Sequence, residues 1–186
     1  MFHQSPKTIY ADDDTEPVSL LLRLRIPPLL VGLVLGIGIS FLTSRFEDVL
    51  KTNVHVAFFI PFIVYLADAV GTQSQTIYAR DLRNRHVKLH NYLFKETILG
   101  IILSVWFGLI SWFVVSLWLH DTPLAWSVGI SVMLGVGVAP LVGIVVTELL
   151  KDLHEDPAVG SGPIATIIQN AISIVIYGIV TSAILL

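Results

Sequence analysis

The 186-residue sequence contains no cysteine, and charged residues make up only 13% of it. Without cysteine the chain forms neither disulfides nor zinc–thiolate sites. Soluble domains carry about 25% charged residues, whereas 54% of this sequence is hydrophobic. The formal net charge of −3 argues against a nucleic-acid partner. The composition therefore favours a protein surrounded by membrane lipid.

Long apolar segments account for most of the chain. A helix needs roughly 20 apolar residues to cross a hydrocarbon core of about 30 Å. The segments that meet or approach this length are Ile26–Thr43, Val54–Ala79, Glu96–Leu119, Leu124–Leu150 and Ile164–Leu186. Backbone polar groups in lipid must be satisfied internally, so each segment is expected to be a helix. We predict an all-α protein with five transmembrane helices, inserted as a multi-pass protein in the inner or plasma membrane.

The positions of Lys and Arg predict the orientation of these helices, because cytoplasmic loops carry an excess of both. With a cytoplasmic N-terminus and an external C-terminus, all of the eleven positive charges except Arg45 and Lys51 would face the cytoplasm. The basic stretch ARDLRNRHVKLHNYLFK is expected to be the only sizeable loop. Its His86 and His90 have metal-capable spacing but no evident third ligand. Residues 1–19 are polar and acidic, without a signal-peptide core, and are expected to form a disordered cytoplasmic tail.

Asp68 interrupts the apolar run FFIPFIVYLADAVGTQSQT. At a rise of 1.5 Å per residue it lies roughly 21 Å from the outer end of its helix, in the inner half of the membrane. A carboxylate at such a position costs about 2.5 kcal/mol or more, so it should face protein, water or a cation. Two interpretations stay open: an ion or proton pathway, or a structural carboxyl bonded to a neighbouring helix.

Polar residues in the last apolar segment are expected partners of Asp68. Thr166 and Asn170 are four residues apart and share a helix face. We expect these two and Asp68 to contribute cation ligands. Glu148 and Asp156 at the inner ends are either inner-mouth metal sites or helix-end charges. Further residues expected to line the pathway are Gln73, Gly162 and Gln169.

The chemistry of this candidate ligand set narrows the cation. All the ligands are oxygens, which disfavours zinc and copper and favours hard cations. Mg²⁺ fits best, because it keeps several waters and needs few carboxylates. Na⁺, Ca²⁺ and Mn²⁺ remain compatible with the same residues.

Three stretches resemble the membrane domain of the MgtE magnesium channels. KDLHEDPAVGSGPIATIIQNAISIVIYG is similar to the family signature in which the last helix follows a DPA-x-x-SGP-type turn. FIPFIVYLADAVGTQSQT resembles the second helix, where Gly-Gly-Asn-x-Gly-x-Gln is usual, and FKETILG the start of the third. The likeness covers residues 20–186, interpreted as an MgtE-like five-helix transmembrane domain.

The resemblance implies a homodimer that transports Mg²⁺ along the subunit interface, through a pathway lined by the second and fifth helices. Family channels carry large cytosolic regulatory domains, including a CBS pair, ahead of the membrane part. In this sequence only about 20 residues precede the membrane part, and they are the expected tail described above. A separate cytosolic regulatory protein is therefore one option for the control of transport.

The sequence departs from the family pattern at the expected site. The family's pore carboxylate falls at Asn170, and its second-helix Asn falls at Ala69, while Asp68 replaces a glycine. Our hypothesis is that Asp68 supplies the central charge, with two copies facing the pathway in a dimer.

Three other functions are alternatives to cation transport by this chain alone. An intramembrane enzyme would need a convergent catalytic set, and ELLKDLHED lacks HExxH or ExxH spacing. We therefore expect no enzyme. A non-conducting or modulatory subunit would suit the lost family carboxylate. An ion-coupled cation exchanger would use a protonatable Asp68.

Overall fold

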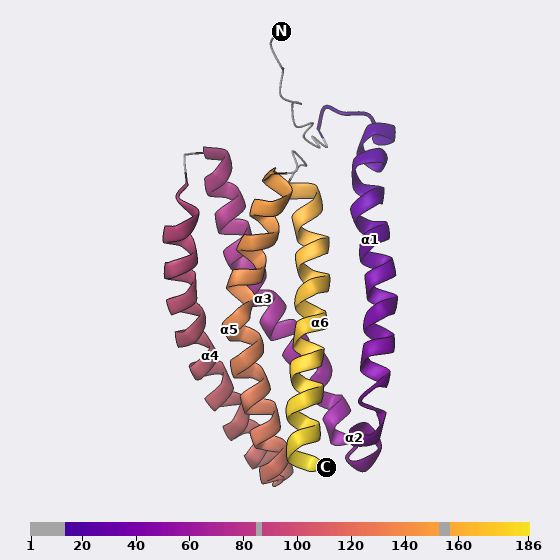
Figure 1. Cartoon of the computed structure of the whole chain (residues 1–186), viewed down its shortest axis with the longest axis vertical. Helices are drawn as coiled ribbons and strands as arrows, with labels where there is room; N and C mark the ends of the chain where they lie inside the picture. The colour runs from indigo at the N-terminus through magenta and orange to yellow at the C-terminus, as the bar shows by residue number, and fades with distance from the viewer. Residues whose placement is uncertain (1–13, 85–86, 153–156) are drawn as a thin grey trace.

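The computed structural model describes residues 14–84, 87–152 and 157–186, with side chains of 157–161 left aside. All regular structure in these ranges is helical. The helices are α1 (Val18–Ser44), α2 (Glu47–Thr52), α3 (His55–Asn84), α4 (Leu89–Leu119), α5 (Thr122–Asp152) and α6 (Pro157–Leu185). The five long helices run side by side, with α2 a short connector at one end of the bundle (Figure 1).

The five expected spans are confirmed as helices, and each is long and apolar enough to cross a membrane. Their ends differ from the expectation. The stretch 79–95 is not a sizeable loop, because α3 continues to Asn84 and α4 begins at Leu89. This stretch has no glycine or proline to stop a helix, so both helices continue into it. At the N-terminal side, α1 begins at Val18, inside the expected tail. His86 lies outside the described residues.

The core of the bundle is built around α5, which contacts α3, α4 and α6. Its valines Val128, Val132 and Val136 are almost fully buried. Glycines bring α4 against α5: a Cβ on Gly108 would lie 2.8 Å from the Gly129 carbonyl oxygen. Such close backbone approach is how helices associate in lipid, where apolar burial gives little driving force. By contrast, α1 contacts α6 and contains no buried residue.

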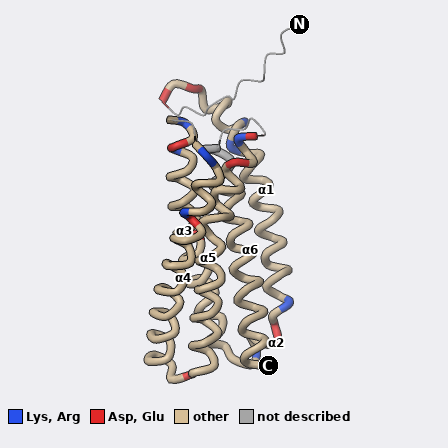
Figure 2. Tube along the Cα trace, turned by 60° about the vertical axis from the view of Figure 1, so that its left-hand side comes forward, with Lys and Arg blue, Asp and Glu red and all other residues tan. Residues whose placement is uncertain are grey.

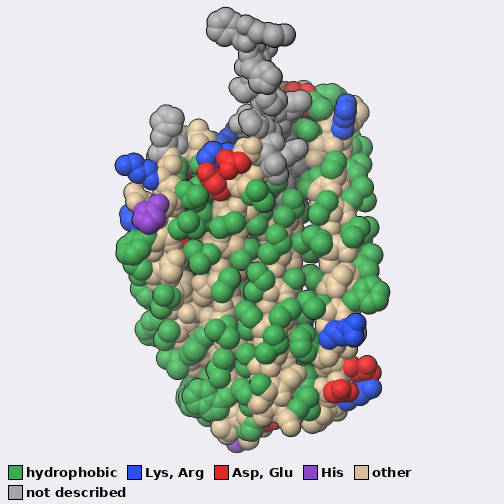
Figure 3. Space-filling model, in the orientation of Figure 1, with side chains coloured by type: hydrophobic (Ala, Val, Ile, Leu, Met, Phe, Trp, Pro, Cys, Tyr) green, Lys and Arg blue, Asp and Glu red, His purple; other side chains and the backbone are tan. Residues whose placement is uncertain are grey.

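Charged residues are concentrated at the end of the bundle where α3 leads into α4 (Figure 2). Hydrophobic side chains cover most of the visible surface between the two ends (Figure 3). At the opposite end, Asn53 Nδ2 donates to Asp121 Oδ2 at 3.0 Å, and Asp121 Oδ1 accepts from the Leu124 backbone N–H at 3.0 Å. Asp121 thereby caps α5 and ties it to the segment before α3.

Replacing Gly108 by valine should destabilise the bundle, because the new side chain would separate α4 from α5. We expect a loss of about 1–3 kcal/mol in the free energy of unfolding, typical of overpacking, measured by denaturant unfolding of purified protein in detergent. Gly38→Val is the matched control, since nothing lies within 4 Å of a Cβ built on Gly38. Equal stability of the two variants would contradict the close α4–α5 contact.

Candidate cation pathway

One face of α3 is open and combines polar with apolar side chains. An open groove of about 610 Å³ runs along it. Its lining residues follow helical spacing and are Tyr65, Asp68, Ala69, Thr72, Gln73, Thr76 and Ile77. Thr72, Gln73 and Thr76 are exposed, and Asp68 is half-buried. Because polar groups inside a membrane face protein or water, this groove is a candidate for a hydrated surface.

Helix α6 is joined to α3 close to Asp68. Gln169 Nε2 donates to the Ala67 carbonyl oxygen at 2.7 Å, and Gln169 is only 3% exposed. A Cβ on Gly71 would overlap the Gln169 amide, so the glycine makes room for this contact. Ala67 directly precedes Asp68 and Gln169 directly precedes Asn170. The α3–α6 contact therefore lies one residue along the chain from both candidate ligands.

Asn170 carries an orphaned polar atom. Its Oδ1 is buried without a hydrogen-bond partner among the described residues, as is Ser173 Oγ. Leaving a buried acceptor unsatisfied costs about 1–3 kcal/mol. Such an oxygen is suited to a cation or to its hydration water. The candidate ligands are thus a carboxylate on α3 that lines the groove and a buried amide oxygen on α6 that has no hydrogen-bond partner among the described residues.

Comparison with known proteins gives the family of the chain. A family model described as "MgtE: Divalent cation transporter" matches residues 60–180, which is more than half of the chain. The chain belongs to the MgtE family. The resemblance seen in the sequence is confirmed, and the protein is a multi-pass membrane protein.

Curated relatives in this family are named magnesium transporters. The chain is 32% identical over 156 residues to "Magnesium transporter MgtE" of Enterococcus faecalis, covering 82% of this chain and 34% of the relative. The chain is 30% identical over 166 residues to "Magnesium transporter MgtE" of Bacillus subtilis, covering 85% of this chain and 36% of the relative. It is 29% identical over 176 residues to the protein of the same name of Thermus thermophilus, covering 92% of this chain and 38% of the relative. The chain therefore spans little more than a third of its relatives' length.

The structure distributes the expected MgtE-type site residues over different environments. Asp68 and Gln73 line the groove, whereas Gln169 is buried against α3. Thr166 and Gly162 on α6 are half-buried. Within the described residues no hydrogen bond joins Asp68, Thr166 and Asn170, and no three His, Cys, Asp or Glu side chains group as metal ligands.

The expected inner-mouth residues have a mixed outcome. Glu148 Oε2 accepts from the Tyr78 hydroxyl at 2.7 Å, and Glu148 Oε1 accepts from Lys151 Nζ at 2.7 Å. Its carboxylate is therefore already occupied by protein partners. Asp156 lies outside the described residues.

A carboxylate that the sequence reasoning passed over is Glu96. It accepts a hydrogen bond from Ser74 Oγ at 2.6 Å, on the side of α3 away from the groove. In the sequence, the feature that could have indicated Glu96 is its position as an acidic residue directly before a long apolar run in α4.

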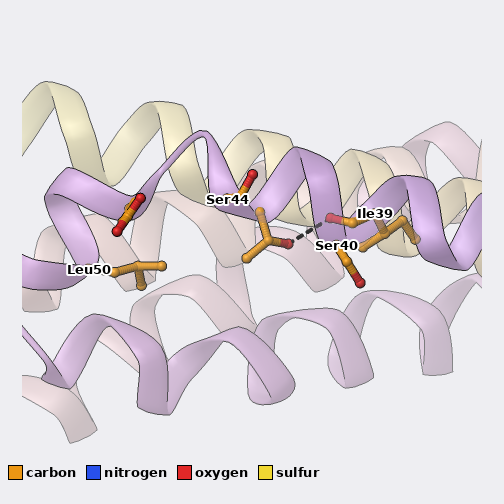
Figure 4. Close-up of a pocket in the computed structure, with 6 residues that line it drawn as sticks. Ile39, Ser40, Ser44 and Leu50 are labelled. Atoms are coloured by element: carbon orange, nitrogen blue, oxygen red, sulfur yellow. Dashed lines mark hydrogen bonds between the residues drawn. The ribbon is translucent and has the colours of Figure 1, made fainter.

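A second open pocket, of about 380 Å³, lies where α1 meets α2 (Figure 4). Thr43 Oγ1 donates to the Ile39 carbonyl at 2.9 Å, and Ser44 Oγ donates to the Phe41 carbonyl at 2.7 Å. Glu47 is paired with Lys51. These polar groups already have partners within their own helices, so the pocket does not present a ligand set.

The contact between Gly71 and Gln169 can be tested by paired substitutions. Gly71→Ala should lower the free energy of unfolding by about 1–3 kcal/mol, because the methyl group overlaps the amide. Adding Gln169→Ala to Gly71→Ala should restore part of the loss by making room. Denaturant unfolding in detergent measures both effects. A double variant whose loss equals the sum of the two single losses would contradict the contact.

Proposed function

We propose that this chain transports divalent cations, with Mg²⁺ the best fit, along a pathway at the interface of a homodimer lined by α3 and α6. The observation that carries the proposal is the polar groove on α3, where Asp68, Thr72 and Thr76 face away from the core of their own protomer. Magnesium transport by the family relatives supports the choice of cation.

A second copy of the chain supplies the missing cover for this groove. An open face of hydroxyls, an amide and a carboxylate is unfavourable against lipid. A two-fold related protomer presents the same face in return, so the two grooves enclose one hydrated pathway with two Asp68 side chains. In this arrangement the membrane lipid contacts the apolar outer surface of the bundle.

The proposed ligands are oxygens that suit a partly hydrated Mg²⁺. Asp68 provides the charge, while Asn170 Oδ1 and the Thr166 hydroxyl provide neutral oxygens from α6. Gln73 lines the pathway between Asp68 and the Asn84 end of α3. The Glu148 carboxylate is assigned a structural role, because Tyr78 and Lys151 already occupy it.

The charged end of the bundle is proposed to face the cytoplasm, which places the N-terminus inside and the C-terminus outside. The support is the concentration of Lys and Arg where α3 meets α4 (Figure 2). In the longer relatives roughly two thirds of the chain lies outside the matched part. A separate cytosolic regulatory protein is the proposed partner at this end of the bundle.

Replacing Asp68 by asparagine should abolish uptake, because the pathway loses its charge while the side chain keeps its size. Purified protein in liposomes containing a Mg²⁺-sensitive dye would report uptake after external Mg²⁺ is added. Asp48→Asn, an exposed acidic residue on α2, is the matched control and should keep wild-type flux. Full uptake by folded Asp68→Asn would refute the proposed role of Asp68.

The same assay separates the remaining functions. Uptake that requires a proton or sodium gradient would identify an ion-coupled exchanger, for which Asp68 is the candidate coupling group. Absence of flux from folded wild-type protein, with or without such gradients, would favour a modulatory subunit.

Replacing Asn170 by aspartate should strengthen cation binding, because a second carboxylate would join Asp68 in attracting the cation. We expect a several-fold lower half-saturating Mg²⁺ concentration, and a lower maximal rate if release becomes slow. Asn170→Leu removes the oxygen and should reduce uptake. An unchanged concentration dependence in both variants would place Asn170 outside the pathway.

A further inference from the structure

Helix α3 carries a second polar face, buried inside the protomer. Ser74, Tyr78 and Asp81 follow helical spacing and are 4%, 0% and 7% exposed. At 3.6 residues per turn this face lies opposite Thr76 of the groove. The helix is therefore polar on two sides, one open and one closed by α4 and α5.

Each residue of the buried face is bonded to a side chain of another helix. Ser74 Oγ donates to Glu96 Oε2 at 2.6 Å and the Tyr78 hydroxyl donates to Glu148 Oε2 at 2.7 Å. The Tyr92 hydroxyl donates to Asp81 Oδ2. The Tyr78 and Tyr92 rings are in edge contact, with centroids 4.9 Å apart. We call these three hydroxyl–carboxylate pairs the α3 ladder.

The ladder restricts the rotation of α3 about its own axis, which apolar packing constrains only weakly. In lipid, apolar side chains have similar energies against lipid and against other helices, so packing alone constrains rotation about a helix axis weakly. Bonds from α6 to α3 go to backbone carbonyls, as in Gln169 to Ala67 and Tyr177 to Val56. The ladder instead holds α3 by the side chains of Ser74, Tyr78 and Asp81, which lie on one face of the helix.

The Ser74–Glu96 pair is the rung nearest the groove. Ser74 lies six residues after Asp68, about 9 Å along the helix, and two residues after Thr72. A rotation of α3 by one residue position would turn Asp68 and Thr72 away from their present direction. The Ser74–Glu96 pair is therefore one of the contacts that hold the groove in its present direction, together with the other two rungs and the Gln169–Ala67 bond.

We propose that Glu96, acting through Ser74, is a positioning residue that aims the Asp68 face of α3 into the cation pathway. The inference rests on the proposed function of the groove. It assigns Glu96 no contact with the cation: the carboxylate accepts from Ser74, and Ser74 holds α3.

The orientation of α3 can be measured without transport, because the natural chain has no cysteine. Thr72→Cys provides a single thiol in the groove, and its labelling rate with a charged, water-soluble thiol reagent reports exposure to water. We expect Glu96→Ala or Ser74→Ala to change this rate several-fold and Glu96→Gln, which keeps an acceptor oxygen, to leave it near the parent value. An unchanged rate in both alanine variants would overturn the proposal.

Ser111→Ala is the matched control for the loss of a buried hydroxyl. Ser111 lies on α4 and donates within its own helix, to the Phe107 carbonyl at 2.6 Å. Its substitution should leave the labelling rate unchanged. If Glu96→Ala fails to fold, Ser74→Ala tests the same rung by removing a single oxygen. No labelling of Thr72→Cys in the parent would instead count against the groove as a hydrated pathway.

Transport distinguishes positioning from a direct action of the Glu96 charge on the cation. Glu96→Ala and Ser74→Ala should each raise the half-saturating Mg²⁺ concentration several-fold and alter the ratio of Mg²⁺ to Mn²⁺ uptake. The double variant should be no worse than either single one, because both remove the same contact. Loss of uptake in Glu96→Gln, with Ser74→Ala unaffected, would show that the charge itself acts and would overturn the proposal.

Discussion

The structure depends on one constraint: inside a membrane, every polar group needs a partner within the protein or a hydrated surface. Most buried hydroxyls of the described helices find this partner in a backbone carbonyl of their own helix. Ser131, Thr147 and Thr181, for example, donate to the carbonyl four residues earlier in the same helix. Polar groups that lack this local solution are informative. They include the open groove residues on α3 and the orphaned oxygens of Asn170 and Ser173. Ser74 Oγ has a local partner in the Val70 carbonyl oxygen at 3.4 Å, but its shorter bond, at 2.6 Å, goes to Glu96 Oε2 on α4.

The arrangement of helices gives α3 a special position. Helix α5 is surrounded by α3, α4 and α6 and forms the packed centre, while α1 lies at the periphery against α6. Helix α3 touches this centre on one side only and leaves the opposite side open. A helix placed in this way can present a polar face to a second protomer while its other face remains anchored. The groove and the α3 ladder are two consequences of the same location.

The sequence was sufficient for the five spans, the family and the unusual status of Asp68, because hydropathy, signature motifs and a charge in an apolar run are local properties. It was insufficient for contacts between distant segments. Ser74 and Glu96 are 22 residues apart, and only the folded structure reveals the bond between their side chains. Gln169 was expected to line the pathway, yet it is buried against Ala67. Spacing predicts which residues share a face but not which neighbour that face meets.

The proposed pathway has its charge on a different helix from the one that the family resemblance implies. The resemblance to the family places a carboxylate at Asn170 on α6, whereas this chain has its carboxylate at Asp68 on α3. The Gln169–Ala67 contact lies one residue from both positions, so the charge stays at nearly the same level of the bundle. In a symmetric pair the number of carboxylates along the pathway is also kept. In the proposed pathway the charge is therefore aimed by the rotation of α3, the helix whose Ser74 donates to Glu96.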